Sequence, residues 1–368
     1  MGSVKVSCGL LHSLCLDADG HVWACGRNGD GRLGLGFGDT TDRFTAEKIE
    51  GLENIVEIVC GRTFSVCVGK EGEVFAFGSN RHGELGLGDT QELRAPNQVK
   101  TLPPVISVAG GAYHSVFVDN KRRVWVVGSD DCAQLGLMGG RITKPRQLSF
   151  PASIASVACG KYFTMCLDIE GSVWSFGLNT MGQLGGQRQR GHNLPDKVPI
   201  LKDIVSVACG DDHTVCLDKN EIVWSFGANR MGQLGLGDTT PRCFPTEVME
   251  HVAEIHCGYN HTLCVDVDRT LWGFGSNLYG QLGMGSESSV LVPTKIPNVA
   301  QVYMVSYGGD HNICRDSVGS IWVFGNNYNG QLSLGDQFLE PIETPQELDN
   351  DISAIFYDRA LNAKSARK

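Results

Sequence analysis

The chain has 368 residues, a formal net charge of -10 and an isoelectric point near 5.5. This acidic balance argues against a surface that binds nucleic-acid phosphates or anionic lipids. The sequence contains neither a run of about 18 apolar residues nor a charged segment that leads into an apolar one, so it predicts no transmembrane helix, membrane insertion or signal peptide. We therefore expect a cytoplasmic protein, with the nucleus as the alternative.

Glycines recur along the chain with a period of 48 to 52 residues. Each is followed fourteen residues later by an aromatic residue, and this offset accounts for all six tryptophans. A second glycine follows three residues after each aromatic. The seven pacing glycines are Gly9, Gly61, Gly111, Gly160, Gly210, Gly258 and Gly308. A sevenfold repeat of this kind predicts one closed array over residues 1–358, followed by a short basic tail at 359–368.

Each repeat contains the signals of four short strands, which the fifth repeat illustrates. An apolar first strand at 204–209 ends at the pacing glycine, and a second follows at 214–217. A turn leads into a third strand at 222–226, and a fourth begins near Pro245. Four strands per repeat predict an all-β, seven-bladed β-propeller with four-stranded blades; an open solenoid would need polar end units, which the first repeat lacks. Residues 352–356 look like a further first strand, so we expect the two ends of the chain to meet.

Two motifs identify a known family. Gly-x-x-His-Ser/Thr occurs at 210–214 and Gly-x-Asn-x-x-Gly-Gln-Leu-Gly at 227–235. Together they resemble the repeat of the regulator of chromosome condensation family over most of the chain. The resemblance implies a seven-bladed propeller. It leaves function open, because members of that family include a nucleotide exchange factor for a nuclear GTPase, an ultraviolet-B photoreceptor, a β-lactamase inhibitor and many scaffolding domains.

The cysteines and histidines follow the repeat, which favours packing over chemistry. Eleven of the fourteen cysteines lie one residue before or six residues after a pacing glycine, where other repeats hold Gly110, Phe117 or Tyr307. We interpret them as buried, reduced residues; the alternative is that the two positions face each other and oxidise. Phe64 and Phe163 replace the motif histidine in two repeats. We expect no metal site, no cofactor and no catalytic centre, and therefore no enzyme.

The loops after the first and third strands are expected to emerge on one face and to carry a protein-binding surface. Tyrosine, methionine and arginine, which protein interfaces enrich, occupy their variable positions together with aspartates. The candidate contact residues are Tyr113, Lys161, Tyr162, Asp211, Asp212, Arg230, Met231, Tyr259, Tyr279, Asp310 and Tyr328. A second candidate group is basic and comes from repeats three and four, where the loops depart from the repeat: Arg141, Lys144, Arg188 and Arg190.

These features favour a non-enzymatic protein-interaction propeller that acts as a scaffold or regulatory module. Its partner would be a protein, including an acidic or phosphorylated segment, whereas nucleic acid is disfavoured. The alternative function is exchange on, or regulation of, a small GTPase. The family's exchange factor carries an inserted β-wedge, and no period here is long enough to hold one. The photoreceptor's exposed tryptophans are also missing, because all six lie in third strands. The sequence leaves the oligomeric state open.

Overall fold

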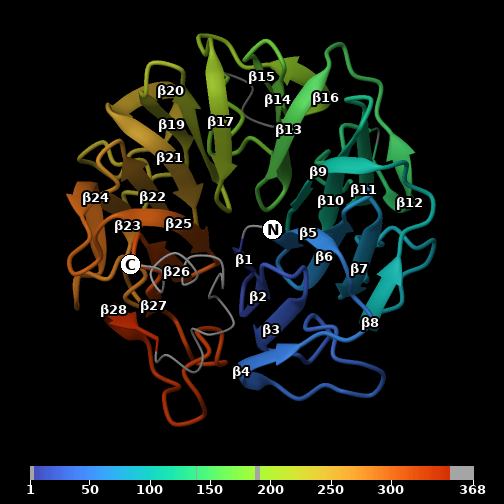
Figure 1. Cartoon of the computed structure of the whole chain (residues 1–368). Coiled ribbons are helices and arrows are strands. Elements are labelled where there is room, and N and C mark those ends of the chain that lie inside the picture. The colour runs from blue at the N-terminus through green and yellow to red at the C-terminus, as the bar shows by residue number, and fades with distance from the viewer. Residues whose placement is uncertain (1–3, 138, 187–190, 349–368) are drawn as a thin grey trace, which may run out of the picture.

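The computed structural model describes residues 4–137, 139–186 and 191–348, which form seven four-stranded antiparallel sheets around a central axis (Figure 1). Within these residues every regular element is a strand, and no helix occurs. The expected all-β, seven-bladed propeller is therefore confirmed. The basic tail at 359–368 and residues 352–356 lie outside the described residues.

Each blade takes its four strands in chain order from the axis to the rim. The first strands are β1 (Lys5–Cys8), β5 (Ile55–Cys60), β9 (Val105–Gly110), β13 (Ile154–Cys159), β17 (Ile204–Cys209), β21 (Val252–Cys257) and β25 (Val302–Tyr307). The second strands are β2 (His12–Leu16), β6 (Phe64–Gly69), β10 (His114–Asp119), β14 (Phe163–Asp168), β18 (His213–Asp218), β22 (His261–Asp266) and β26 (His311–Asp316).

The third strands are β3 (Val22–Gly26), β7 (Val74–Gly78), β11 (Val124–Ser129), β15 (Val173–Gly177), β19 (Val223–Gly227), β23 (Leu271–Ser276) and β27 (Ile321–Gly325). The fourth strands, at the rim, are β4 (Arg43–Lys48), β8 (Leu93–Gln98), β12 (Arg141–Gln147), β16 (His192–Lys197), β20 (Arg242–Met249), β24 (Ser289–Lys295) and β28 (Ile342–Glu347).

The apolar core lies between neighbouring blades. In one cluster Leu14 and Leu33 of the first blade pack with Ile58 and Phe77 of the second, and a similar cluster fills each of the other interfaces. A blade therefore buries its faces only against its two neighbours, which makes closure of the ring necessary for burial of both.

The pacing glycines exist because a ring packs directly on their backbone. A Cβ built on Gly9 would lie 2.2 Å from Cε1 of His12 and 2.7 Å from the carbonyl oxygen of Gly61 in the next blade. In the fourth blade the phenyl ring of Phe163 lies in the same way over Gly160, where a Cβ would lie 1.9 Å from Cε1 of the ring. Any side chain at this position would separate the ring from the backbone and push adjacent blades apart.

The motif histidines join neighbouring blades through hydrogen bonds. Nε2 of His12 lies 3.0 Å from Oγ of Ser65 in the next blade, and that hydroxyl donates to the carbonyl oxygen of Arg32 at 2.7 Å. Because the serine hydrogen is used, the imidazole Nε2–H donates to Ser65 Oγ. The same arrangement joins His114 to Thr164, His213 to Thr262, His261 to Asn312 and His311 to Ser13.

Burial keeps these imidazoles neutral, because it lowers the pKa of His213 and His311 to about 3. They therefore act as structural groups at physiological pH, as the repeat pattern indicates.

The six tryptophans also have a structural partner. The indole Nε1–H of Trp174 donates to Oδ2 of Asp168 at 2.9 Å, and each of the other five tryptophans makes the equivalent bond to the aspartate six residues earlier. The second blade lacks both partners at once, since it has Gly69 and Phe75 in the two positions. This paired replacement leaves no aspartate without its indole.

All fourteen cysteines lie within the described residues, and none forms a disulfide. The strand register shows why, because Cys209 lies opposite Thr214 and Cys216 lies opposite Val207. The two cysteine positions thus do not face each other across the hairpin. Nine of the eleven repeat cysteines are buried, as the packing interpretation expects, whereas Cys60 and Cys159 are only partly buried. The register contradicts a disulfide across the hairpin.

The fourth strands start earlier than the sequence suggested. β20 begins at Arg242, three residues before Pro245, so the proline lies inside the strand. A rim strand tolerates proline because its outward N–H needs no partner, and proline also blocks pairing with another chain. Six of the seven rim strands carry such a proline, at Pro96, Pro145, Pro195, Pro245, Pro293 and Pro345.

The first blade is the exception, and it lies where the ring closes. Both end blades are complete, so β1 packs beside β25 without exchange of a strand between the described ends. Here Ala46 replaces the rim proline, and its N–H donates to Oγ of Ser333 at 2.8 Å. Ser333 in turn replaces the glycine that the other six repeats use in this loop, at a positive φ of 59°. The donor that proline would have removed is thus satisfied across the closing interface.

We expect Ser333→Ala to lower the free energy of unfolding by about 1–2 kcal/mol, because the Ala46 N–H loses its acceptor at a partly buried site. Urea unfolding measures the loss. When Ala46 is replaced by proline, Ser333→Ala should lower the free energy of unfolding by distinctly less, because residue 46 then has no N–H that needs an acceptor. Equal costs in both backgrounds would show that this hydrogen bond does not stabilise the closure.

Candidate functional site

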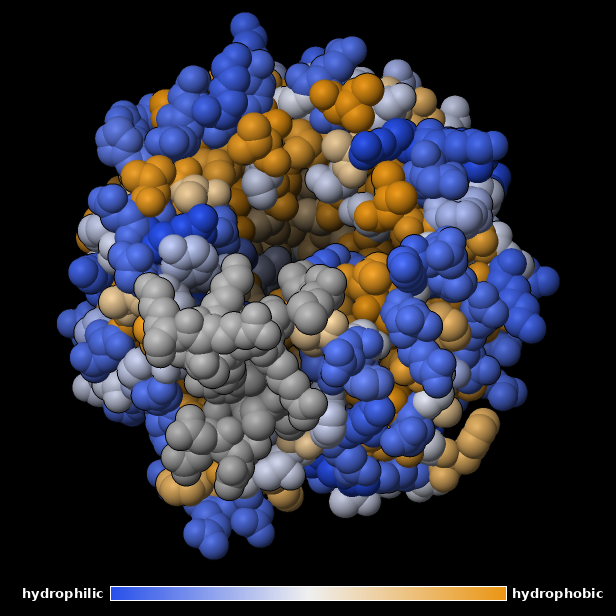
Figure 2. Space-filling model, viewed as in Figure 1, coloured by the Kyte–Doolittle hydropathy of each residue, from blue (hydrophilic) through white to orange (hydrophobic). Residues whose placement is uncertain are grey.

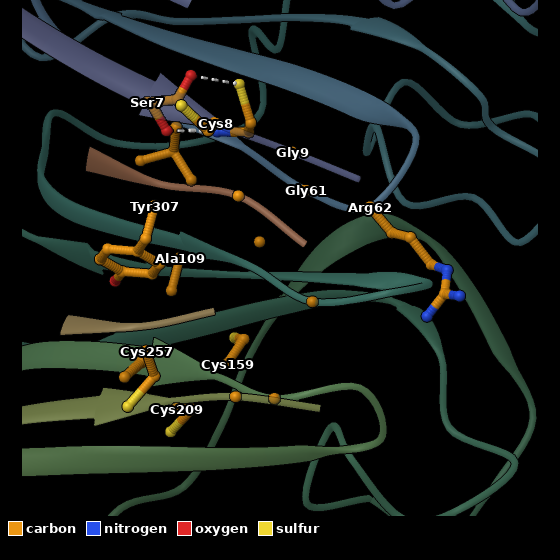
Figure 3. Close-up of a pocket in the computed structure, with 18 of the residues that line it drawn as sticks. Ser7, Cys8, Gly9, Gly61, Arg62, Ala109, Cys159, Cys209, Cys257 and Tyr307 are labelled. Atoms are coloured by element: carbon orange, nitrogen blue, oxygen red, sulfur yellow. Dashed lines mark hydrogen bonds between the residues drawn. The ribbon is translucent and has the colours of Figure 1, made fainter. Parts of the chain in front are cut away.

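The first strands surround an axial cavity of about 320 Å³. Its wall is formed by small and apolar residues, including Val6, Ile58 and Val207, together with cysteines that precede the pacing glycines. The space-filling view shows the hollow at the centre of the ring, with hydrophobic residues along its wall (Figure 2). In the close-up Cys159, Cys209 and Cys257 lie along the cavity, and Arg62 lies apart from them at one end (Figure 3).

The mouth at this end is formed by the residues that directly follow the pacing glycines, and backbone hydrogen bonds join them into a ring. The N–H of Lys161 donates to the carbonyl of Asp211, that of Asp211 to Tyr259, and that of Tyr259 to Gly309, each at 3.0 Å. Three further bonds continue the ring: Gly309 to Gly9, Leu10 to Arg62 and Arg62 to Gly111. The side chains at the mouth therefore stand on a rigid frame that spans six of the seven blade interfaces.

Arg62 is the centre of a charged cluster at this mouth. Its Nη1 lies 3.5 Å from Oδ2 of Asp211, and its guanidinium lies over the ring of Tyr259, 5.0 Å from the centroid. Gly309 leaves room for that ring, because a Cβ there would meet Tyr259 Cε2 at 3.0 Å. Four residues far apart in the sequence are thus held together by the ring of blades.

Aromatic side chains extend the cluster over the second to fourth blades. The rings of Tyr113 and Tyr162 lie 5.8 Å apart, and His82 packs on Tyr113 at 4.6 Å. Nζ of Lys161 lies 5.4 Å from the centroid of Tyr162. Because all four side chains are only partly buried, they offer a continuous aromatic and cationic surface to solvent.

The carboxyl groups at the mouth are held in an environment that resists their ionisation. Burial raises the pKa of Asp211 to about 6, although Arg62 and Lys161 oppose the rise, and burial raises the pKa of Asp310 to about 6 as well. Burial also raises the pKa of Asp212, which Lys161 opposes. Two cations thus only partly compensate three partly buried aspartates.

Glutamine side chains from the loops after the third strands orient two of these aspartates. Nε2 of Gln183 donates to Oδ1 of Asp212 at 3.2 Å, and Nε2 of Gln281 donates to Oδ1 of Asp310 at 3.0 Å. In each pair the two residues come from adjacent blades. The loops after the first and third strands therefore share one face, as the strand order predicts.

The remaining candidates on this loop face lie in the loops after the third strands. Tyr279 and Tyr328 form an edge-to-face pair across the last two blades, with ring centroids 6.3 Å apart. Arg230 is exposed, and Met231 is half-buried with its N–H bound to Gln233 Oε1 at 2.9 Å. The face thus holds a central charged and aromatic cluster and a separate tyrosine pair.

The basic candidates do not join this cluster. Arg141 and Lys144 lie on β12, the rim strand of the third blade, and β11 and β10 separate it from β9, which lines the cavity. Arg188 and Arg190 lie outside the described residues. The structure therefore places Arg141 and Lys144 apart from the loop-face candidates.

Sequence reasoning missed Arg62 and His82. Arg62 directly follows a pacing glycine, as do the candidate contact residues Lys161, Asp211 and Tyr259. Alignment of the repeats would therefore have identified Arg62 as a candidate. His82 gave no such signal, because only the fold brings it against Tyr113 of the next blade.

Among the described residues no group of three or more His, Cys, Asp or Glu side chains is arranged to hold a metal ion. A search of the same residues for a helix long and apolar enough to span a membrane gave none. The mouth cluster combines aromatic rings, cations and carboxylates on a rigid ring, which is the chemistry of protein recognition.

The fold and this site define a seven-bladed β-propeller that presents its variable side chains on the loops around the axis. The sequence model described as the RCC1-like domain matches residues 1–202 and 151–364, and the chain belongs to this family.

Two human relatives are similar to short segments of the chain. Human Protein RCC2 is 43% identical over 84 residues, which are 22% of this chain and 16% of that protein. The human probable E3 ubiquitin-protein ligase HERC6 is 40% identical over 83 residues, which are 22% of this chain but only 8% of that protein. The matched segments thus represent small parts of both relatives.

Among solved structures, Prp20p from Saccharomyces cerevisiae, studied for its binding properties to Gsp1p and histones, matches with a TM-score of 0.81 and 21% identity. The match covers 95% of this chain and 87% of that one. At this identity the likeness concerns the fold.

We expect Asp310→Asn to stabilise the protein at neutral pH. The pKa of Asp310 is about 6 when folded and 3.8 ordinarily, so the folded state holds the proton more tightly, and stability is lost as the pH rises from about 4 through 6. The variant does not ionise there and keeps the oxygen that accepts from Gln281. The free energy of unfolding of the variant should equal that of the wild type near pH 4 and exceed it by roughly 1–3 kcal/mol at pH 7.5.

Urea unfolding at both pH values measures this difference. The exposed Asp268→Asn serves as the control and should show no pH-dependent gain. A constant difference between Asp310→Asn and the wild type across this pH range would contradict the environment assigned to Asp310.

Proposed function

We propose that this protein is a non-enzymatic interaction module that binds a protein partner through the loop face around the axial cavity. The observation that carries the proposal is the cluster of Arg62, Lys161 and Tyr259 on a hydrogen-bonded backbone ring, with Tyr113 and Tyr162 packed together beside Lys161. None of these side chains takes part in the histidine or tryptophan bonds that hold the blades together.

The chemistry of the cluster suits a protein surface. Tyrosine and arginine supply large contact areas and directed hydrogen bonds, and they dominate the energetics of many interfaces. The mutual packing of His82, Tyr113 and Tyr162 reduces the side-chain entropy that binding would cost. We place this activity in the cytoplasm or the nucleus.

A second candidate is regulation of a small GTPase, including nucleotide exchange. The similarity in fold to Prp20p, whose solved structure was studied together with its binding to Gsp1p, favours it. Against exchange by an inserted wedge, each blade has four strands in the described residues, with no added hairpin. The loop face would serve as the contact surface in this case as well.

We expect a Tyr113→Ala/Tyr162→Ala variant to lose most protein partners that the wild type retains in affinity capture from the native lysate. The two rings lie together on the loop face, so their removal deletes the centre of the proposed contact. The melting temperature should stay close to that of the wild type. Quantitative mass spectrometry of the captured proteins gives the readout.

Tyr303→Ala is the matched control, because Tyr303 is exposed on a first strand and packs on Arg269, away from the loop cluster. The control should retain the partners. Retention of all partners by the double variant, or equal loss in the control, would refute the proposed surface.

Release of a fluorescent guanine nucleotide from a panel of small GTPases distinguishes the two candidate functions. A pure interaction module leaves the release rate unchanged at substoichiometric concentrations of this protein. Acceleration with turnover would replace the first proposal by the second, and the Tyr113→Ala/Tyr162→Ala variant would then show whether the same face is used.

A further inference from the structure

The rim strand of the third blade differs in charge from the other six. β12 carries Arg141, Lys144 and Arg146 and no carboxylate. None of the other rim strands has more than two lysines and arginines, and β28 has two glutamates and no cation. All three β12 cations are exposed to solvent.

The arginines that open other rim strands have an internal partner that Arg141 lacks. Arg242 pairs with Asp238 at 2.6 Å, and Arg43 pairs in the same way with Asp39, four residues earlier in each case. Four residues before Arg141 the chain has Leu137. Within the described residues no ion pair involves Arg141, Lys144 or Arg146.

Carboxylates near β12 in the sequence or the fold are engaged elsewhere. Asp130 accepts from the backbone N–H groups of Leu135 and Gly139, both at 2.8 Å, and Asp131 accepts from the hydroxyl of Ser129 at 2.9 Å. Asp119 is paired with Arg123 at 2.6 Å. Within the described residues, none of these three carboxylates forms an ion pair with a cation of β12.

Lys144 extends the basic strip to the boundary with the second blade. Its aliphatic chain lies over Gly88, since a Cβ there would meet Lys144 Cε at 2.8 Å, and the Gly88 N–H donates to the carbonyl of Thr143 at 2.8 Å. Asp89, which follows Gly88, is bound by Asn80 Nδ2 and by the N–H of Gln91. The ammonium thus projects from a fixed stem between two blades.

The local charge contrasts with that of the whole chain. Residues 105–148 contain six lysines and arginines against three aspartates, a net charge of +3, whereas the chain carries -10. A local patch of opposite sign on an acidic protein attracts an acidic segment, while the overall charge repels a long polyanion such as nucleic acid.

The backbone of β12 limits how a partner binds. Pro145 removes one N–H from the strand, and the Thr143 carbonyl is already used by Gly88, so addition of a continuous strand is blocked. Recognition must rely on side chains. Arg141 lies opposite Ser129 and Arg146 opposite Val126 on β11, with a register irregularity between them. The two arginines are therefore about 10 Å apart along the strand, within reach of a short extended peptide.

We propose that the rim of the third blade, formed by Arg141, Lys144 and Arg146, binds an extended, carboxylate-rich segment of a protein partner. This surface is separate from the loop face, so the proposal stands or falls independently of the function assigned to that face (Figure 1).

The test is fluorescence anisotropy with a labelled twelve-residue peptide of alternating glutamate and serine. A peptide with glutamine in place of glutamate and a twelve-residue oligothymidylate serve as the other ligands. The test variant is Arg141→Glu/Lys144→Glu/Arg146→Glu. The control variant, Lys100→Glu/Lys202→Glu/Lys295→Glu, makes the same change in net charge at exposed lysines on three other blades.

The wild type should bind the glutamate peptide and should lose at least tenfold in affinity between 50 and 200 mM salt. The test variant should lose at least tenfold at low salt, and the control variant less than threefold. Thermal melts show that both variants are folded.

Equal losses in the two variants would overturn the proposal, because binding would then depend on net charge alone. Tighter binding of the oligothymidylate would overturn it in favour of nucleic acid. Light scattering of the free protein tests whether a second copy, through its acidic β28, occupies the rim; self-association abolished by the test variant would likewise contradict the proposed partner.

Discussion

The packing of a flat ring on the backbone of each pacing glycine is the contact on which the rest of the molecule depends. The ring belongs to histidine in five blades and to phenylalanine in two. In the first, third, fifth and seventh blades the glycine carbonyl of the next blade lies against the same spot. Because each blade buries its faces only against its neighbours, one short contact repeated around the axis sets the blade spacing. The residue after each glycine is then fixed at the mouth of the cavity.

The residues that stabilise the fold differ from those that form the proposed binding surface. The motif histidines, the tryptophans and most of the repeat cysteines are used in bonds and packing between or within blades, and burial keeps the histidines neutral. The variable positions next to the glycines are free to differ between blades, and in this chain they bring Arg62, Asp211 and Tyr259 together. A similar argument applies at the rim, where six of the seven blades share a proline but the blades differ in charge.

The sequence predicted the architecture well because the same pattern of strand and turn residues occurs in all seven repeats. Strand positions, the shared loop face and the packing role of the cysteines follow from periodicity alone. The start of the fourth strands was misplaced, since proline was taken as a boundary although rim strands accept it. Contacts between residues far apart in the sequence could not be predicted in this way. The hydrogen bond between Ser333 and Ala46 depends on closure of the ring, and the contact of His82 with Tyr113 depends on packing between blades. The contact role of the residues chosen from the sequence remains a prediction, and Arg188 and Arg190 among them lie outside the described residues.

Equilibrium unfolding of Gly210→Ala beside His213→Phe tests the central constraint most directly. A Cβ on Gly210 would lie 2.1 Å from Cε1 of His213 and 2.6 Å from the carbonyl oxygen of Gly258, so both the ring and the next blade would have to move. His213→Phe keeps a flat ring of the kind that two blades already use and loses one hydrogen bond. We predict a loss of about 1–2 kcal/mol for His213→Phe and a larger loss, or failure to fold, for Gly210→Ala. A Gly210→Ala variant as stable as the wild type would contradict the account.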